Sequence, residues 1–136
     1  MKINTPISVG ELVDKITILE IKSVMIKDEN KLKEVENERK ELNQKFADLI
    51  NPTLGFNLSS SNLLALKADL HAINLGLWKI EDQIRECERN KDFDAKFIRL
   101  ARDVYYTNDR RFEIKNEINQ LTNSDVKEVK SYEPYN

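Results

Sequence analysis

The chain has 136 residues, a net charge of −2 and 34% charged residues of both signs, which suits one domain with a hydrophobic core. This charge balance argues against a general nucleic-acid binder, which carries a basic excess, and no apolar run reaches the ~20 residues of a membrane-spanning helix. A lone cysteine, Cys87, and the lack of a signal-peptide pattern lead us to expect a soluble cytoplasmic protein with no nucleic-acid or membrane partner.

Scarce glycine and proline, with abundant Lys, Glu, Leu and Ile, favour an all-helical chain. The first expected helix begins at Ser8, which has the spacing of a capping box, and runs to about Lys27. A second helix is expected over about residues 31–50, where apolar side chains recur every three or four positions. Pro52 and Gly55 are stop signals that separate this second helix from the next one.

The third expected helix opens in the serine-rich residues 59–62 and has the most regular apolar pattern of the chain. A tight turn at residues 89–94 leads to the fourth expected helix, over about residues 94–121, whose apolar ladder is interrupted by polar residues near its middle. The ladder of the third helix has coiled-coil spacing over four heptads: Leu63, Leu66, Leu70, Ile73, Leu77, Ile80, Ile84 and Cys87.

Helices joined by short turns run antiparallel, so these elements predict an all-α fold of about four helices in a single domain over residues 1–136. The fold is either an antiparallel bundle or two helical hairpins, with extended N- and C-terminal arms. An open coiled-coil hairpin that completes its core by dimerising is the alternative. Residues 123–136 form the expected C-terminal tail, which could pair with the equally extended residues 1–7.

Charged residues interrupt two of the apolar helix faces. Asp14 and Glu20 lie among aliphatic residues on the first helix, where an unpaired carboxylate costs several kcal/mol. Arg111 lies on the apolar ladder of the fourth helix, with Asn108 and Lys115 one step around it. We expect these five residues to form one polar layer, in which Glu20 and Arg111 are paired. The layer is either a structural ion pair that fixes register or a ligand pocket.

The other residues that could take part in catalysis or bind a ligand have simpler interpretations. His71, the only histidine, shares a second stripe of the third helix with Trp78 and Asp82, and we interpret His71 as structural and Trp78 as either core or a contact within the helical hairpin. The paired Glu-x-x-His motifs of di-iron bundles, Cys/His clusters for zinc and glycine-rich phosphate loops are all missing. We therefore expect no metal and no cofactor.

Several long blocks of the sequence resemble an uncharacterised family of small bacterial and phage-borne proteins. These blocks are "ISVGELVDKITILEIK", "LWKIEDQIRECE…DF…FIRLARDVYYTNDRRFEIKNEIN" and the ending "KSYEPY". They span most of the chain but leave out the second helix and the loop after it. The resemblance implies no activity, substrate or cofactor. It does imply that certain residues are family features: Asp14, Lys15, Glu20, Asn108, Asp109, Arg110 and the terminal Tyr-x-Pro-Tyr.

Two functions are compatible with these patterns. The first is a non-catalytic protein-interaction or assembly module, which acts through helical faces and the aromatic tail (Tyr132 and Tyr135) and predicts a homo-oligomer or a protein partner. The second is a protein or enzyme that binds a small anionic ligand through Glu20, Asn108, Arg111 and Lys115, in a pocket between the first and fourth helices.

Overall fold

The computed structural model describes residues 1–51, 53 and 60–136. In this part of the chain the fold is all-α, as predicted, and no residue is in a strand. Its helices are α1 (Val9–Met25), α2 (Glu29–Ile50), α3 (Ser60–Arg89) and α4 (Ala95–Leu121). The predicted stop signals Pro52 and Gly55, and Ser59 of the serine-rich opening, lie outside the described residues.

Local capping explains where the helices begin and end. The Ser8 hydroxyl accepts a hydrogen bond from the Glu11 backbone N–H at 3.0 Å, which confirms half of the predicted capping box. The Glu11 carboxylate does not return to Ser8 and binds a lysine on α4. Asp28 caps α2 by accepting from the Lys31 backbone N–H at 2.9 Å. In the turn after α3, Lys91 takes a positive φ of 52°.

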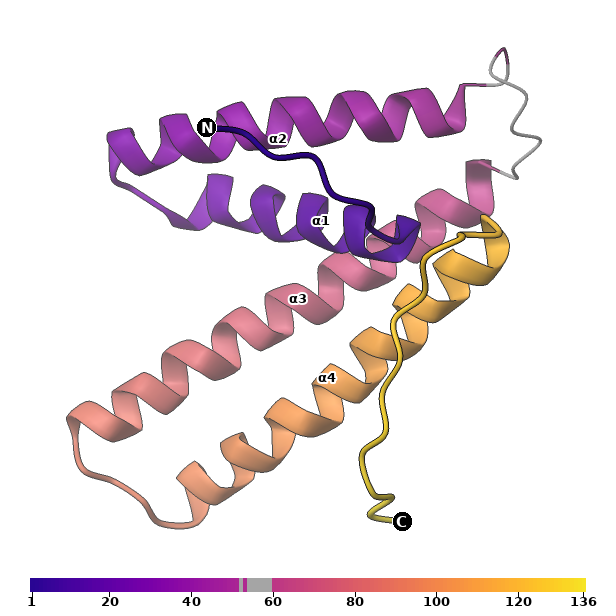
Figure 1. The fold of residues 1–136 in the computed structure, drawn as a ribbon. Helices are drawn as coiled ribbons and strands as arrows, with labels where there is room; N and C mark the ends of the chain where they lie inside the picture. Colours follow the sequence, from indigo (N-terminus) through magenta and orange to yellow (C-terminus); the bar gives the residue numbers. More distant parts are fainter. Residues whose placement is uncertain (52, 54–59) are drawn as a thin grey trace.

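The four helices form two hairpins that cross at an angle, α1 with α2 and α3 with α4 (Figure 1). Helix α1 contacts all three other helices, whereas α2 packs mainly against α1. The buried apolar cluster comes from the first halves of α1 and α3 and the second halves of α2 and α4: Leu12, Val13, Ile16, Phe46, Leu63, Leu70, Ile114 and Ile118. The core therefore lies at one end of the molecule, and the hairpins diverge beyond it.

The ladder of α3 is buried unevenly as a result. Leu63 and Leu70 are fully buried in the core, whereas Leu77 and Ile80 are half-buried. Only α4 runs beside α3 in the half that contains Ile80 (Figure 1), so one side of the ladder has no helix over it. Periodicity predicted the ladder correctly but did not predict which part of it would be covered.

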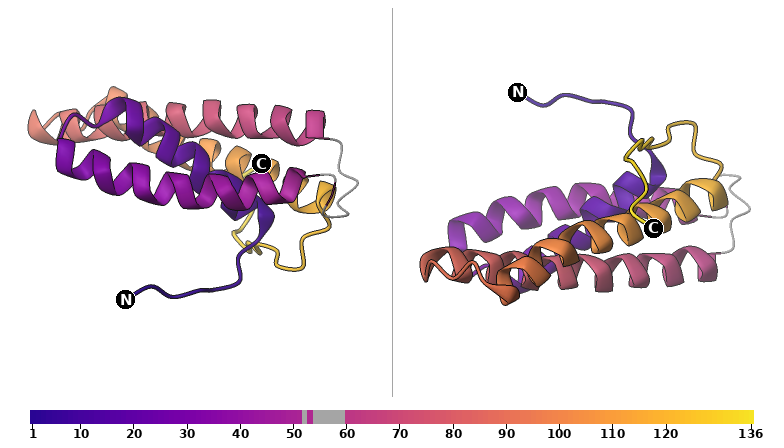
Figure 2. Two further views of the ribbon diagram at one scale, coloured as in Figure 1. Left: turned by 90° about the horizontal axis from the view of Figure 1, so that it is seen from above. Right: turned by 90° about the horizontal axis from the view of Figure 1, so that it is seen from below.

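The two chain ends are extended arms, but they do not pair with each other. They meet only where the Val9 backbone N–H donates to the Ser124 hydroxyl at 3.2 Å, and from there they run in different directions (Figure 2). Lys2 of the N-terminal arm forms an ion pair with Glu41 of α2 at 2.9 Å. The C-terminal arm runs back along α4. The predicted pairing of residues 1–7 with the tail is therefore wrong.

None of the helices described in this structure has the length and apolarity that crossing a membrane requires.

Candidate functional site

A buried carboxylate on α1 joins three helices. Asp14 has no exposed surface, and its Oδ1 accepts from Arg111 Nε of α4 at 2.9 Å. Its Oδ2 accepts from Arg111 Nη2, which makes the pair bidentate. From α3, Asn74 Nδ2 donates to Asp14 Oδ1 at 2.8 Å and to Thr17 Oγ1 at 2.9 Å. This network satisfies the buried charge and fixes α1 against both α3 and α4.

The same network holds the Arg111 guanidinium in place. Its hydrogen bonds to Asp14 raise the pKa of Arg111 above its usual value, although partial burial opposes this. The Arg111 side chain is 27% exposed, and Nε and Nη2 are the atoms engaged by Asp14. Nη1 has no hydrogen-bond acceptor among the described residues. Arg111 is therefore a fixed cation that still has N–H groups to offer.

Glu20 does not belong to this layer, and the predicted pair of Glu20 with Arg111 is wrong. Glu20 Oε1 accepts from Lys67 Nζ of α3 at 2.6 Å, and the His71 ring lies 4.0 Å from Oε2. Six positions separate Asp14 from Glu20, which places them about 120° apart around α1. Only one of the two carboxylates can face Arg111, and the crossing of the hairpins selects Asp14.

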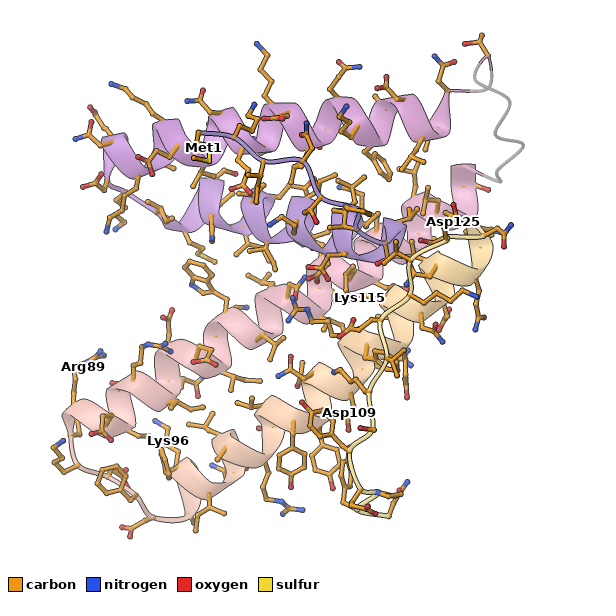
Figure 3. All side chains as sticks on the ribbon, in the orientation of Figure 1. Met1, Arg89, Lys96, Asp109, Lys115 and Asp125 are labelled. Atoms are coloured by element: carbon orange, nitrogen blue, oxygen red, sulfur yellow. The ribbon has the colours of Figure 1, made fainter. Side chains whose placement is uncertain are left out.

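Lys115 forms a separate cluster one turn further along α4. Its side chain is only 8% exposed, and its Nζ lies 2.7 Å from Glu11 Oε2 of α1 and 2.8 Å from Glu128 Oε2 of the C-terminal arm. Burial by itself lowers the pKa of Lys115, but the hydrogen bond to Glu11 and the ion pair with Glu128 outweigh it, and the pKa is raised. Figure 3 shows Lys115 near the start of α1, where helix and arm converge. Lys115 is therefore a structural cation that holds the C-terminal arm against α1 and α4.

A pocket of about 470 Å³ lies where α1 diverges from the α3–α4 hairpin. Asn108 and Arg111 of the predicted polar layer reach it, whereas Asp14, Glu20 and Lys115 are not among its lining residues. This volume is in the range of small-molecule sites. The lining residues are Ile18, Ile21, Asn74, Leu77, Trp78, Glu81, Asp82, Arg85, Asn108 and Arg111.

Charged groups in this pocket are paired with one exception. Arg85 binds Glu81 one turn before it on α3, and Arg111 binds Asp14. The Asp82 side chain forms no hydrogen bond or ion pair with any described residue. The side chains of Trp78 and Asn108 also have no hydrogen-bond partner in the described part of the chain. Three polar groups are thus available to a molecule in the pocket.

The lining residues come from the blocks that carry the sequence resemblance. All of them except Asn74 belong to "ISVGELVDKITILEIK" or to the long block that begins "LWKIEDQIR". The sequence did not lead us to predict the role of Asn74, nor that Trp78 lines a pocket. Asp82 was placed on the stripe of Trp78 but not at a site. Trp78 and Asp82 are four residues apart and so share one helix face. This spacing was the signal in the sequence that could have indicated that they line a common site.

A second pocket, of about 620 Å³, lies between α4 and the C-terminal arm. Two of its lining residues are joined by a hydrogen bond from the Tyr135 hydroxyl to Asp109 Oδ2 at 2.6 Å, and this bond raises the pKa of Tyr135 to about 12. The Tyr135 ring also packs on Tyr105 and Tyr106, with centroids 5.3 Å and 4.9 Å away. Figure 3 shows Asp109 beside the arm. Asn108 lines both pockets, so α4 separates the two cavities at this residue.

Within residues 1–51, 53 and 60–136, no group of three or more His, Cys, Asp or Glu side chains is placed to hold a metal ion.

Comparison with known proteins identifies the family. The sequence matches a family of unknown function, DUF6165, over residues 1–135, and the chain belongs to this family. The match also covers α2, which the sequence resemblance had left out. No curated protein and no solved structure matches the chain.

Proposed function

We propose that this member of the DUF6165 family binds a small polar organic molecule in the pocket between α1, α3 and α4. The observation that carries the proposal is the set of polar side chains without partners in that pocket. Asp82, Trp78 and Asn108 line it, and their side chains have no hydrogen bond within the described part of the chain. Asp82 is exposed and Trp78 and Asn108 are half-buried, so water can cover these groups in the free protein and a ligand can replace that water, whereas the buried Asp14 is satisfied by Arg111 and Asn74.

The surroundings of these three groups support the proposal. The bonds among Asp14, Arg111 and Asn74 fix one wall of the pocket before any ligand arrives, which lowers the entropic cost of binding. Apolar side chains of α1, Ile18 and Ile21, form the opposite wall. A pocket with apolar walls and a few convergent polar groups is the usual form of a small-molecule site.

The site expected from the sequence is only partly the site proposed here. Of Glu20, Asn108, Arg111 and Lys115, only Asn108 and Arg111 line the pocket. Glu20 and Lys115 are engaged in other ion pairs. The described residues leave no unpaired cation in the pocket, so the anionic character of the ligand stays a prediction from the sequence.

A ligand screen tests this proposal. Trp78 is the only tryptophan, so its fluorescence reports on the pocket without interference from other sites. We expect at least one compound of a chemically diverse library to change this fluorescence with a Kd below about 1 mM. Asn108→Ala should weaken that compound by about tenfold. Asn116→Ala, on α4 but outside the pockets described, should leave its binding unchanged. If no compound binds, or if both variants behave alike, the proposal fails.

Assembly through a helical face is a second candidate, and exposed apolar residues favour it. Beyond the core, the α3–α4 hairpin exposes Phe93 (47%) and Ile98 (57%), and Ile80 and Ile84 are only half-buried. A second copy of the chain could cover this surface. The start of α4 is basic and the end of α3 is mainly acidic, which suits an antiparallel contact between two copies: Lys96, Arg99 and Arg102 against Glu81, Asp82, Glu86 and Glu88.

Sedimentation analysis decides whether this surface joins two copies. We expect a concentration-dependent dimer at micromolar protein that Ile98→Glu converts to a monomer. The control is Val129→Glu, which places the same charge on the exposed C-terminal arm and should still allow dimers. A wild-type protein that sediments as a monomer at high concentration would remove the support for self-assembly.

A further inference from the structure

We infer that the pocket between α1, α3 and α4 selects an organic cation, such as a ligand with an ammonium group. Asp82 would neutralise this group, and the face of Trp78 would lie against it. This inference rests on the proposed function and names the ligand class that the same pocket would accept.

The spacing of Trp78 and Asp82 is the first support. They are four residues apart on α3, so they share one face of the helix, and both line the pocket. A cation placed over an indole ring is attracted by the ring's electron density, and the attraction grows when water is excluded. A carboxylate one turn away adds a charge-assisted hydrogen bond to the same group.

The charge of the lining is the second support. Arg85 is neutralised by Glu81, and Arg111 is neutralised by Asp14 behind the pocket wall. Asp82 is the one charged lining residue without a partner among the described residues, so it leaves the pocket with one uncompensated negative charge. An anionic ligand would be repelled by Asp82, and the charge of Arg111, whose remaining N–H groups could still donate to it, is already offset by Asp14.

The rest of the lining defines the remainder of the ligand. Ile18, Ile21 and Leu77 offer apolar contact to a hydrocarbon or aromatic body. Asn108 can donate and accept a hydrogen bond, which suits a polar group at the other end of the molecule. A pocket of about 470 Å³ is large enough for a small organic molecule of this kind.

Three probes of nearly equal shape test the inference: 2-phenylethylammonium, 2-phenylethanol and phenylacetate. Their affinities can be measured by Trp78 fluorescence and by calorimetry on the full chain. We expect the cation to bind at least about tenfold more tightly than the alcohol, and phenylacetate to bind most weakly. The preference for the cation should weaken as salt is added, because screening reduces the attraction to Asp82.

The variant Asp82→Asn isolates the carboxylate, because it removes the charge and keeps the shape. It should reduce the cation's affinity to that of the alcohol, while the alcohol's own affinity stays within about twofold. Asp103→Asn is the matched control, since Asp103 is also without a partner in the described residues but does not line this pocket. It should preserve the selectivity.

The remaining outcomes separate the inference from the proposed function. If the alcohol or phenylacetate binds as tightly as the cation, the pocket binds ligands but does not select cations, and the inference alone is overturned. If none of the probes binds while the library yields another compound, the inference is again overturned and the proposed function stands. If Asp82→Asn keeps the same preference for the cation over the alcohol, the inference is overturned as well.

Discussion

A single carboxylate, Asp14, organises the polar centre of the protein. It is fully buried and accepts hydrogen bonds from Arg111 and Asn74, which lie on two different helices. The sequence predicted that both Asp14 and Glu20 need partners, because each interrupts an apolar helix face. It could not tell which of them meets Arg111, since that depends on the angle at which α1 crosses α4. The residue pattern predicts that a buried carboxylate needs a partner, whereas the tertiary structure determines which residue that partner is.

Replacing Arg111 by Met should destabilise the protein strongly. Asp14 would stay buried without its bidentate partner, which costs about 3 kcal/mol or more. Urea denaturation measures the change in the free energy of unfolding. The neighbouring Arg110 is the control, because it is exposed and its one ion pair among the described residues is with Glu113 on its own helix. Arg110→Met should change stability by less than about 0.5 kcal/mol. Equal losses in the two variants would contradict the role given to Asp14.

Tyr135 reports on the docking of the C-terminal arm. Its hydrogen bond to Asp109 raises its pKa to about 12, above the ordinary value of about 10. A raised pKa means that docking favours the protonated phenol. The contribution to docking is therefore complete below about pH 10 and is lost as the pH rises through about 12.

A tyrosinate absorbance titration checks this pH dependence, with circular dichroism recorded alongside to separate ionisation from unfolding. The wild-type protein should contain a tyrosine that ionises near pH 12, and Tyr135→Phe should remove this step. The control is Tyr132→Phe, at the other tyrosine of the arm, which should retain it. If the late step survives in Tyr135→Phe, the bond to Asp109 does not hold the arm.

At the scale of the helices, the contact between α1 and α4 is close because the second residue of α1 is a glycine. The Gly10 backbone N–H donates to Asn119 Oδ1 at 2.7 Å. A Cβ atom at Gly10 would lie 2.5 Å from the Lys115 carbonyl oxygen and 2.9 Å from Asn119 Oδ1. Because the nearest atom belongs to the backbone, a side chain at position 10 would force the two helices apart.

Two glycine substitutions should therefore have opposite effects. Gly10→Ala should destabilise the protein by about 1–3 kcal/mol, because it wedges α1 away from α4. Gly76→Ala should stabilise it by about 0.5–1 kcal/mol, because this glycine is inside α3 and a Cβ there meets nothing within 4 Å. Thermal melts of both variants measure whether each substitution lowers or raises the stability. A loss of stability at Gly76 or a gain at Gly10 would contradict the packing described.

Most helix boundaries could be predicted because they depend on local chemistry. Ser8 caps α1 through the adjacent backbone, and the expected ends of α4 lie within one residue of Ala95–Leu121. The course of the arms and the position of the pocket could not be predicted. The arms follow contacts between residues far apart in the sequence, such as Lys2 with Glu41 and Tyr135 with Asp109. The pocket depends on how far α1 covers the ladder of α3, and a repeat of apolar residues carries no information about which neighbour covers it.

The whole molecule has its core at one end and its candidate site where the hairpins separate. The buried cluster joins all four helices, whereas the pocket is bounded by α1, α3 and α4 only. A closed four-helix bundle would have filled this space with apolar side chains. Here the same space is lined by Trp78, Asp82 and Asn108, and the network around Asp14 keeps one side of it rigid. The divergence of the hairpins is therefore the feature on which the proposed binding function depends.

The most direct test of this claim is a map of amide chemical shifts with a compound from the screen bound to the isotope-labelled protein. We predict that the largest changes fall on the Trp78 indole N–H, the Asn108 side-chain amide and the Arg111 Nε–H, which come from two helices and meet only in the pocket. Changes confined to the C-terminal arm, or to the exposed hairpin around Phe93 and Ile98, would show that the protein binds elsewhere and would contradict the proposed site.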